Sequence, residues 1–155
     1  MKMTIKNDLD LVRTLNKGNW AVLTASLESW GNGHHSRNVE ANECLAEYLD
    51  EQDYAYVPLT GFYKGVDQGA SFLILEIELG DAVKLATRLK QESFMSPLGL
   101  TFCAGATMNA EKLQVCYTPR SGCFIFGKSA EDGENYSKTE NGLAFRMTLI
   151  EKDSK

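Results

Sequence analysis

The chain has 155 residues, of which 43% are hydrophobic, and its formal net charge is −5. This length and composition suit a single globular domain over 1–155, and the net acidity argues against nonspecific nucleic-acid binding. No stretch approaches the roughly 18 consecutive apolar residues of a membrane span, and charged residues follow the N-terminus where a signal peptide would be apolar. We therefore expect a cytoplasmic protein with no membrane partner.

The first third of the chain predicts two helices around one strand. Asn7 is a typical helix cap, and Leu11 and Leu15 share one side of the helix that it would begin. The short apolar run 20–25 predicts a strand, because it is too brief for a buried helix. A loop follows, and then the alternation of apolar and acidic sides predicts a helix over 37–51.

The middle of the chain predicts a strand, a turn, a second strand and a helix. Residues 54–59 favour a strand, and Pro58 places it at an edge or end because proline cannot donate to a ladder. The glycine-rich stretch 61–69 predicts a turn, and a helix is expected over 81–92. The strongest strand pattern covers 71–79, with one apolar face that we expect to be nearly inaccessible: Leu73, Leu75 and Ile77.

The second half of the chain is dominated by predicted strands. They cover 99–103, 113–118, 122–127 and 143–150. The acidic stretch 130–142 has no apolar periodicity and predicts a mobile surface loop. With helices early and strands late, the fold class is α+β: a single domain with a mixed, largely antiparallel sheet and two main helices packed on it.

The four cysteines are far apart, and no CxxC pair or Cys/His cluster with zinc-like spacing is present. They are Cys44, Cys103, Cys116 and Cys123. In a cytosolic chain of this length, reduced thiols are the expected state. We therefore predict neither a metal site, nor a disulfide, nor a cofactor.

Three polar residues are candidates for a ligand site near the end of the first strand. Thr24 ends that strand, and Asn38 and Asn42 lie one turn apart on the helix that follows. Their side chains would converge on a ligand at the carboxyl end of the strand. The alternative is structural, with Thr24 as a strand-end hydroxyl, Asn38 as a helix cap and Asn42 bonded to a neighbouring loop.

His34 and His35 are the only histidines, and they lie in the loop before the helix at 37–51. Adjacent residues in an extended loop point to different sides, so one metal ion would not readily take both. The functional interpretation is acid–base chemistry or a phosphate contact near neutral pH. The alternative is an exposed polar loop.

Three further residues complete the candidate set. Tyr63 and Lys64 lie between two glycines, where they would stack on and neutralise a nucleotide-like ligand or form a plain surface turn. Glu92 ends a helix, where the dipole opposes its charge, which favours a specific partner or role. No residues form a recognisable nucleophile, base and orienter, so the sequence does not decide whether the protein is an enzyme.

Several short motifs resemble those of a known family. In chain order they are Leu23-Thr24-Ala25, Asn38 with Asn42, Leu59-Thr60-Gly61, Ser71-Phe72-Leu73-Ile74 and Gln91-Glu92-Ser93-Phe94. Over about residues 19–96 the chain resembles an uncharacterised family of small bacterial and bacteriophage proteins, a domain of unknown function. The family pattern has an acidic residue where this chain has Gly69-Ala70, so no catalytic carboxylate is carried over. The resemblance implies a stand-alone cytoplasmic accessory protein, of bacterial or bacteriophage origin, without an established activity.

Two function classes follow. The first is a binding or inhibitory module for a host or cellular macromolecule, favoured by small size, acidity and the lack of a catalytic set. The alternative is a small enzyme or binder of a nucleotide-like, phosphate-bearing ligand in a cleft between 26–38 and 61–69. A flat exposed apolar patch would support the first class. A deep pocket would support the second, with four residues in its wall: Thr24, Asn42, Tyr63 and Glu92.

Overall fold

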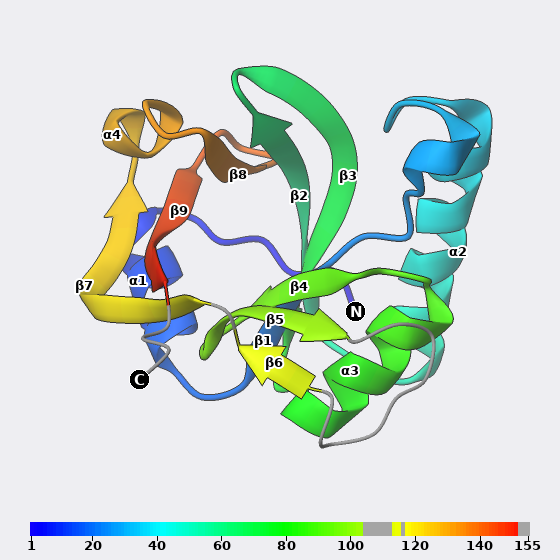
Figure 1. The fold of residues 1–155 in the computed structure, drawn as a ribbon, viewed down its shortest axis with the longest axis horizontal. Coiled ribbons are helices and arrows are strands. Elements are labelled where there is room, and N and C mark those ends of the chain that lie inside the picture. Colours follow the sequence, from blue (N-terminus) through cyan, green and yellow to red (C-terminus); the bar gives the residue numbers. More distant parts are fainter. Residues whose placement is uncertain (104–112, 116, 152–155) are drawn as a thin grey trace.

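A single antiparallel sheet organises the chain in the computed structural model, which describes residues 1–103, 113–115 and 117–151 (Figure 1). Its strands are β1 (Trp20–Leu23), β2 (Tyr56–Tyr63), β3 (Val66–Leu75), β4 (Ser93–Ser96), β5 (Gly99–Cys103), β6 (Leu113–Val115), β7 (Tyr117–Phe126), β8 (Asn135–Thr139) and β9 (Ala144–Glu151). The spatial order is β6-β5-β4-β1-β3-β2-β8-β9-β7, and every neighbouring pair is antiparallel. The predicted α+β class with a largely antiparallel sheet is confirmed.

Helices cover both faces of the sheet. They are α1 (Asp8–Asn16), the short 3-10 helix η1 (Glu28–Trp30), α2 (Ser36–Glu51), α3 (Leu79–Arg88) and α4 (Lys128–Glu131). Asn7 caps α1 as predicted, since its Oδ1 accepts a hydrogen bond from the backbone N–H of Asp10 at 2.9 Å. No helix in the described residues has the length and apolar character of a membrane span.

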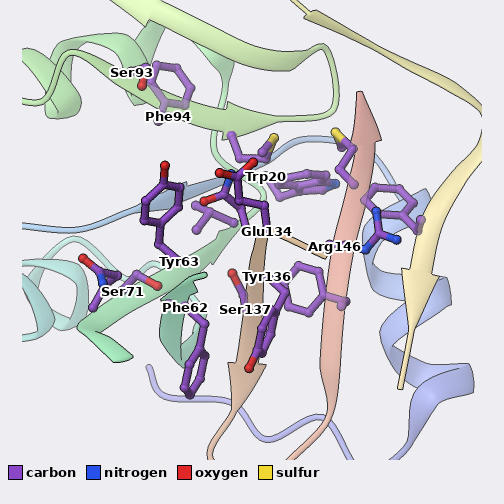
Figure 2. Close-up of a pocket in the computed structure, with 18 of the residues that line it drawn as sticks. Trp20, Phe62, Tyr63, Ser71, Ser93, Phe94, Glu134, Tyr136, Ser137 and Arg146 are labelled. Atoms are coloured by element: carbon purple, nitrogen blue, oxygen red, sulfur yellow. The ribbon is translucent and has the colours of Figure 1, made fainter. Parts of the chain in front are cut away.

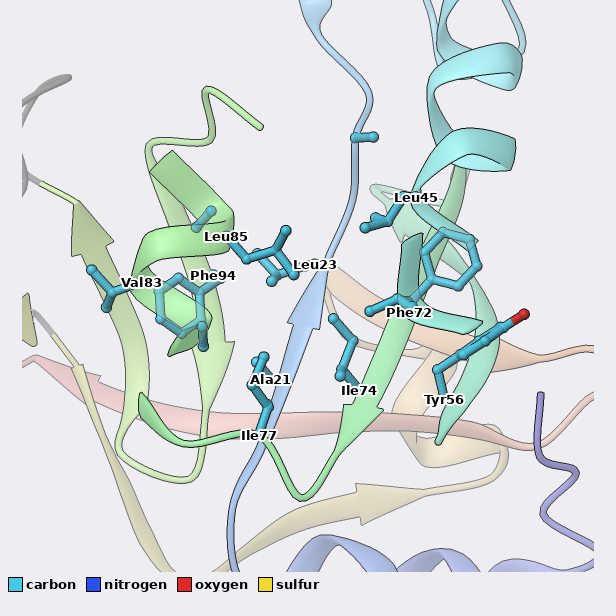
Figure 3. Close-up of a cluster of buried hydrophobic side chains, with 14 of the residues drawn as sticks. Ala21, Leu23, Leu45, Tyr56, Phe72, Ile74, Ile77, Val83, Leu85 and Phe94 are labelled. Atoms are coloured by element: carbon cyan, nitrogen blue, oxygen red, sulfur yellow. The ribbon is translucent and has the colours of Figure 1, made fainter. Parts of the chain in front are cut away.

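The core forms two clusters, one on each face of the sheet. Because side chains alternate along a strand, β1 sends Ala21 and Leu23 to one face and Trp20 to the other. The first cluster joins β1, β3 and β4 to α2 and α3 through residues such as Leu45 and Leu85 (Figure 3). The second cluster lies on the opposite face, where side chains of β1, β2, β3 and β9 pack together with α1.

The predicted turn at 61–69 is wrong in extent. β2 continues to Tyr63 and β3 begins at Val66, so the turn of this hairpin consists of Lys64 and Gly65 alone. Both residues have positive φ, 49° and 78°, as the type I′ turn of a two-residue hairpin requires. β2, which contains Pro58, lies inside the sheet between β3 and β8 rather than at its edge. Pro58 itself lies just before the pairing with β8, which begins at Leu59, so its missing N–H interrupts no bond of that ladder.

The strand expected over 71–79 ends at Leu75. Glu76 has a φ of 52°, which breaks the extended conformation, and α3 begins at Leu79, two residues before the predicted start. Leu73 is fully buried and Ile77 is 2% exposed, but Leu75 is only half-buried. The prediction that all three are nearly inaccessible is therefore wrong for Leu75.

The stretch 130–142, expected to be a mobile loop, contains the end of α4 and the whole of β8. β8 lies between β2 and β9 and pairs with both. Its side chains are mostly polar, so the strand shows no apolar alternation in the sequence. Backbone pairing with β2 and β9 holds it in the sheet instead. The helix expected to reach 92 ends at Arg88, and the unpredicted strand β4 follows.

Candidate functional site

A cavity of about 850 Å³ lies against the face of the sheet that carries the second core cluster (Figure 2). Residues of β1, β2, β3, β4, β7, β8 and β9 line it, so almost the whole curled sheet contributes to its wall. Six aromatic residues line it, Trp20, Phe62, Tyr63, Phe124, Tyr136 and Phe145, whereas the ring of Phe94 packs in the first core cluster. The cavity is therefore both large and rich in rings.

Trp20 gives this wall a fixed aromatic surface. Its indole N–H donates a hydrogen bond to the carbonyl oxygen of Leu15 at 2.8 Å, which ties the ring to α1. The ring centroid lies 6.1 Å from that of Phe124, in a tilted arrangement. Because the only polar atom of Trp20 is satisfied by α1, the ring presents only apolar surface toward the cavity.

The tip of the β2–β3 hairpin and the start of β8 form the rim. Lys64 Nζ lies 3.6 Å from Glu134 Oε1 and 5.3 Å from the ring centroid of Tyr63. The backbone N–H of Lys64 also donates to the carbonyl oxygen of Glu134 at 2.7 Å. Next to them, Phe62 stacks on Tyr136 with centroids 4.8 Å apart and ring planes 6° from parallel. The predicted pair Tyr63 and Lys64 is therefore held against β8.

Two polar atoms in the cavity wall are buried without a hydrogen-bond partner among the described residues. They are Ser71 Oγ and Arg146 Nε. Arg146 packs beneath the turn at Gly133, where an added Cβ would lie 2.4 Å from its Cδ and Nε. Buried polar atoms are nearly always paired, because an unpaired one loses its water without compensation. Each of them has less than 1 Å² of accessible surface, so both lie behind the surface of the cavity rather than on it.

Thr24 and Asn42 lie close together and are engaged with the backbone. Asn42 is 3% exposed; its Oδ1 accepts from the N–H of Ala25 at 2.8 Å and its Nδ2 donates to Ser26 Oγ at 2.9 Å. Thr24 Oγ1 donates to the carbonyl oxygen of Ala70 at 2.7 Å. These bonds attach the end of β1 to α2 and β3, and neither residue lines the large cavity.

Asn38 holds the loop that precedes α2. Its side chain is buried, and its Oδ1 accepts from the N–H of Leu27 at 2.8 Å. Its Nδ2 donates to the carbonyl oxygen of Asn32 at 2.8 Å and to that of Leu27 at 3.2 Å. The amide is occupied by the backbone of its own loop, so Asn38 is not the helix cap that the structural alternative assigned to it; the N-cap of α2 is His35.

The two histidines have separate contacts. His34 Nε2 lies 3.0 Å from Asp67 Oδ1 of β3, and His35 Nδ1 accepts from the N–H of Arg37 at 3.2 Å, which caps α2. Gly33, beside them, packs directly on the backbone of Gln68. The loop before α2 is therefore fastened to β3 near the hairpin.

Glu92 is exposed and lies on a second, more polar hollow of about 420 Å³ beside residues 26–29. Its neighbour Gln91 donates from Nε2 to the carbonyl oxygen of Ser26 at 2.9 Å. The eight candidate residues thus do not gather in one pocket. Tyr63 belongs to the large cavity, and Glu92 to the small one.

The sequence interpretation missed most of the cavity wall. Trp20 was placed in the predicted strand 20–25 without a role in a site, and Tyr136 fell in the expected loop. A usable signal was present at Arg146, a charged residue within the clearest alternating strand of the chain. Arg146 lies on β9, which is covered on both faces: Ala144 is buried on one and Phe145 and Met147 on the other. The alternating pattern predicts only one covered face.

The cysteines described by the structure are free thiols. Cys44 is exposed on α2 and Cys103 is buried in β5. Burial raises the pKa of the Cys103 thiol, and a hydrogen bond with Thr87 opposes this shift. The side chains of Cys116 and Cys123 lie outside the described residues. Within 1–103, 113–115 and 117–151, no group of three His, Cys, Asp or Glu side chains is placed to hold a metal ion.

Comparison of the sequence with models of known protein families finds no matching family, and comparison with curated proteins finds no significant relative.

Proposed function

We propose that the protein is a binding protein for a small, ring-containing apolar molecule held in the cavity of about 850 Å³. One observation carries the proposal: a single large cavity is lined by several aromatic side chains together with a few polar ones. Sites for small molecules typically measure about 300–1,000 Å³ and combine an apolar lining with a few polar groups. The cavity fits this description in both size and chemistry.

A phosphate-bearing ligand is less well supported. The N-terminus of α2 is capped by the side chain of His35, and the amide of Asn38 is used within its own loop. Lys64 pairs with Glu134. The charged residues in the cavity wall are Glu28, Glu134 and Arg146, so carboxylates outnumber the cation there.

A surface for a macromolecule also has less support than the cavity. A docking patch requires several exposed apolar side chains side by side. The large exposed ones among the described residues are Met1, Met3, Leu9, Val39, Tyr63, Val66 and Leu98. Apart from Met1 with Met3 at the N-terminus and Tyr63 with Val66 at the hairpin, they lie on different elements. The binding of a small molecule is therefore the function that the geometry favours.

The proposal is tested with N-phenyl-1-naphthylamine, a neutral aromatic dye whose fluorescence increases in apolar surroundings. Gly61→Phe fills the cavity, because Gly61 lies in its wall, has ordinary backbone angles and has no neighbour closer than 4.0 Å to an added Cβ. We expect saturable binding to the native protein and its loss in Gly61→Phe.

Gly80→Phe is the matched control. Gly80 lies in α3 outside the cavity wall, and an added Cβ there meets no atom within 4 Å. This variant should bind the dye as the native protein does. Absence of saturable binding to the native protein, or equal binding by Gly61→Phe, would contradict the proposal.

A further inference from the structure

The smaller hollow of about 420 Å³ adjoins the large cavity. Glu28 on η1 and Ser93 at the start of β4 belong to the walls of both spaces, so the cavity and the hollow meet at these two residues. A molecule that occupies the large cavity and extends past Glu28 and Ser93 therefore enters the smaller hollow.

The walls of the two spaces differ in chemistry. Six aromatic residues line the large cavity, whereas no aromatic residue among the described ones lines the smaller hollow. Apart from Leu27, the wall of the hollow is polar, and it consists of Ser26, Glu28, Ser29, Lys90, Gln91, Glu92 and Ser93. A ligand that fills both spaces therefore has an apolar ring system and a polar part.

Ser26 is fixed in the wall of the smaller hollow by three side chains. Its backbone N–H donates to Thr24 Oγ1 at 3.1 Å, and its carbonyl oxygen accepts from Gln91 Nε2 at 2.9 Å. Its Oγ accepts from Asn42 Nδ2 at 2.9 Å, which leaves its own O–H as a donor. Thr24 and Asn42 thus shape this wall without lining it, and the hollow is preorganised for a ligand.

Charged side chains of both signs line the smaller hollow, and they are accessible. Glu28, Lys90 and Glu92 are exposed, and none of them forms an ion pair within the part of the chain that the structure describes. A charged group of either sign would meet at least one like charge here. A hydroxyl group both donates and accepts, so it can bond to a carboxylate, an ammonium group or a serine hydroxyl.

We infer that the ligand carries a polyhydroxylated, sugar-like group, which lies in the smaller hollow and bonds to Ser29 and Glu92. This inference rests on the proposed function and adds the class of ligand: an aromatic glycoside whose rings lie in the large cavity. The carboxylate of Glu92 accepts hydrogen bonds from sugar hydroxyls, which gives this candidate residue a role in binding.

Compounds with one ring system separate the inference from the proposed function. The 2-naphthyl β-D-glucopyranoside and the corresponding galactoside share their ring and ether oxygen with 2-methoxynaphthalene, which lacks the sugar. Displacement of N-phenyl-1-naphthylamine measures the affinity of each. We expect at least one glycoside to bind the native protein about tenfold more tightly than the ether, as about one or two net hydrogen bonds would give. Gly61→Phe should abolish the binding of all three.

Two variants of the smaller hollow test where the sugar lies. Glu92→Ala and Ser29→Ala change exposed residues that do not line the large cavity, so each should lower the preference for the glycoside and leave the affinity for the ether unchanged. Glu47→Ala removes an exposed carboxylate of α2 outside both walls and should keep the preference. In the native protein, the backbone amide NMR signals of Ser29 and Glu92 should shift with the glycoside and not with the ether.

Three results would overturn the inference. If the ether and both glycosides bind equally and all are lost in Gly61→Phe, the sugar-like group is wrong and the proposed function stands. A preference for the glycoside that survives both Glu92→Ala and Ser29→Ala would place the sugar elsewhere. A glycoside that binds Gly61→Phe as well as the native protein would not span the two spaces. If no compound binds the native protein, the inference and the proposed function both fall.

Discussion

Asn42 accepts a hydrogen bond from the backbone N–H of Ala25 at 2.8 Å, and through it α2 holds the end of β1. The same amide donates to the side chain of Ser26 and to the carbonyl oxygen of Asn38. A buried side chain with three such bonds has little freedom to bind a ligand. Its contribution is to the stability of the loop that follows β1.

The first prediction concerns this amide. Asn42→Leu keeps the volume of the side chain but leaves the N–H of Ala25 buried without an acceptor, so we expect the free energy of unfolding to fall by about 1–3 kcal/mol. Urea unfolding measures the change, with Glu43→Leu on the exposed side of α2 as control. A loss no larger than that of the control would show that the bond is not important for stability.

A second prediction compares two leucines of β3. Leu73 is fully buried between β1 and β2, so Leu73→Ala should cost about 2–5 kcal/mol through lost burial and a cavity. Leu75 is half-buried, and Leu75→Ala should cost clearly less. Urea unfolding of the two variants tests this order. Equal losses would mean that both side chains are equally enclosed in solution.

A third prediction tests the contact between the loop before α2 and β3. An added Cβ at Gly33 would lie 1.9 Å from the carbonyl oxygen of Gln68, a backbone atom that cannot rotate away. We expect Gly33→Ala to lower the free energy of unfolding by about 1–3 kcal/mol, as overpacking does. Gly80→Ala, with open space around its Cβ, is the control and should not destabilise. A loop that lies apart from β3 in solution would make the two variants alike.

Elements with strong periodicity were predictable from the sequence, and those held by their neighbours were not. α2 and β9 show clear apolar alternation, and both lie within a residue or two of the expected ranges. β8 has the sequence Asn-Tyr-Ser-Lys-Thr, without a regular apolar face. It is held in the sheet by pairing with β2, which is distant in the chain, and with β9, which follows it directly.

The candidate site was harder to predict for the same reason. Thr24, Asn38 and Asn42 were recognised as neighbours because one strand and the next helix carry them. The cavity instead needs residues as distant in the chain as Trp20 and Phe145, which line the same hollow because the sheet curls. Sequence spacing carries no record of that curvature.

A fourth prediction concerns the thiols. Since the thiolate is the reactive form, the exposed Cys44 should react with iodoacetamide well before Cys103, which is buried and has a raised pKa. Mass spectrometry of peptides from the folded protein measures the order. In denaturant the difference should disappear, and all four cysteines should react as free thiols. Equal rates in the folded protein would show that β5 opens readily.

The last prediction is a loss of stability at high pH that depends on Tyr56. Burial raises the pKa of this phenol, and the carboxylate of Asp50, which accepts its hydrogen bond at 3.4 Å, raises it further. The folded protein therefore keeps the proton after the unfolded chain, with a pKa of about 10, has lost it. The contribution of Tyr56 to stability is complete below about pH 10 and is lost as the pH rises toward the folded pKa, by at most about 1.4 kcal/mol per pH unit.

Lys2 and Lys138 also have raised pKa values, through hydrogen bonds with Glu140 and Glu131. Their contributions to stability are therefore also lost as the pH rises. The comparison of the native protein with Tyr56→Phe removes the phenol together with its small charge coupling to Lys2, while the main partners of both lysines, Glu140 and Glu131, are common to the two proteins. We expect urea unfolding between about pH 9 and 11 to show a steeper fall for the native protein than for Tyr56→Phe. Tyr63→Phe, which removes an exposed hydroxyl, is the control and should keep the steeper fall. Parallel curves for the native protein and Tyr56→Phe would show that the phenol ionises as easily in the folded chain as in the unfolded one.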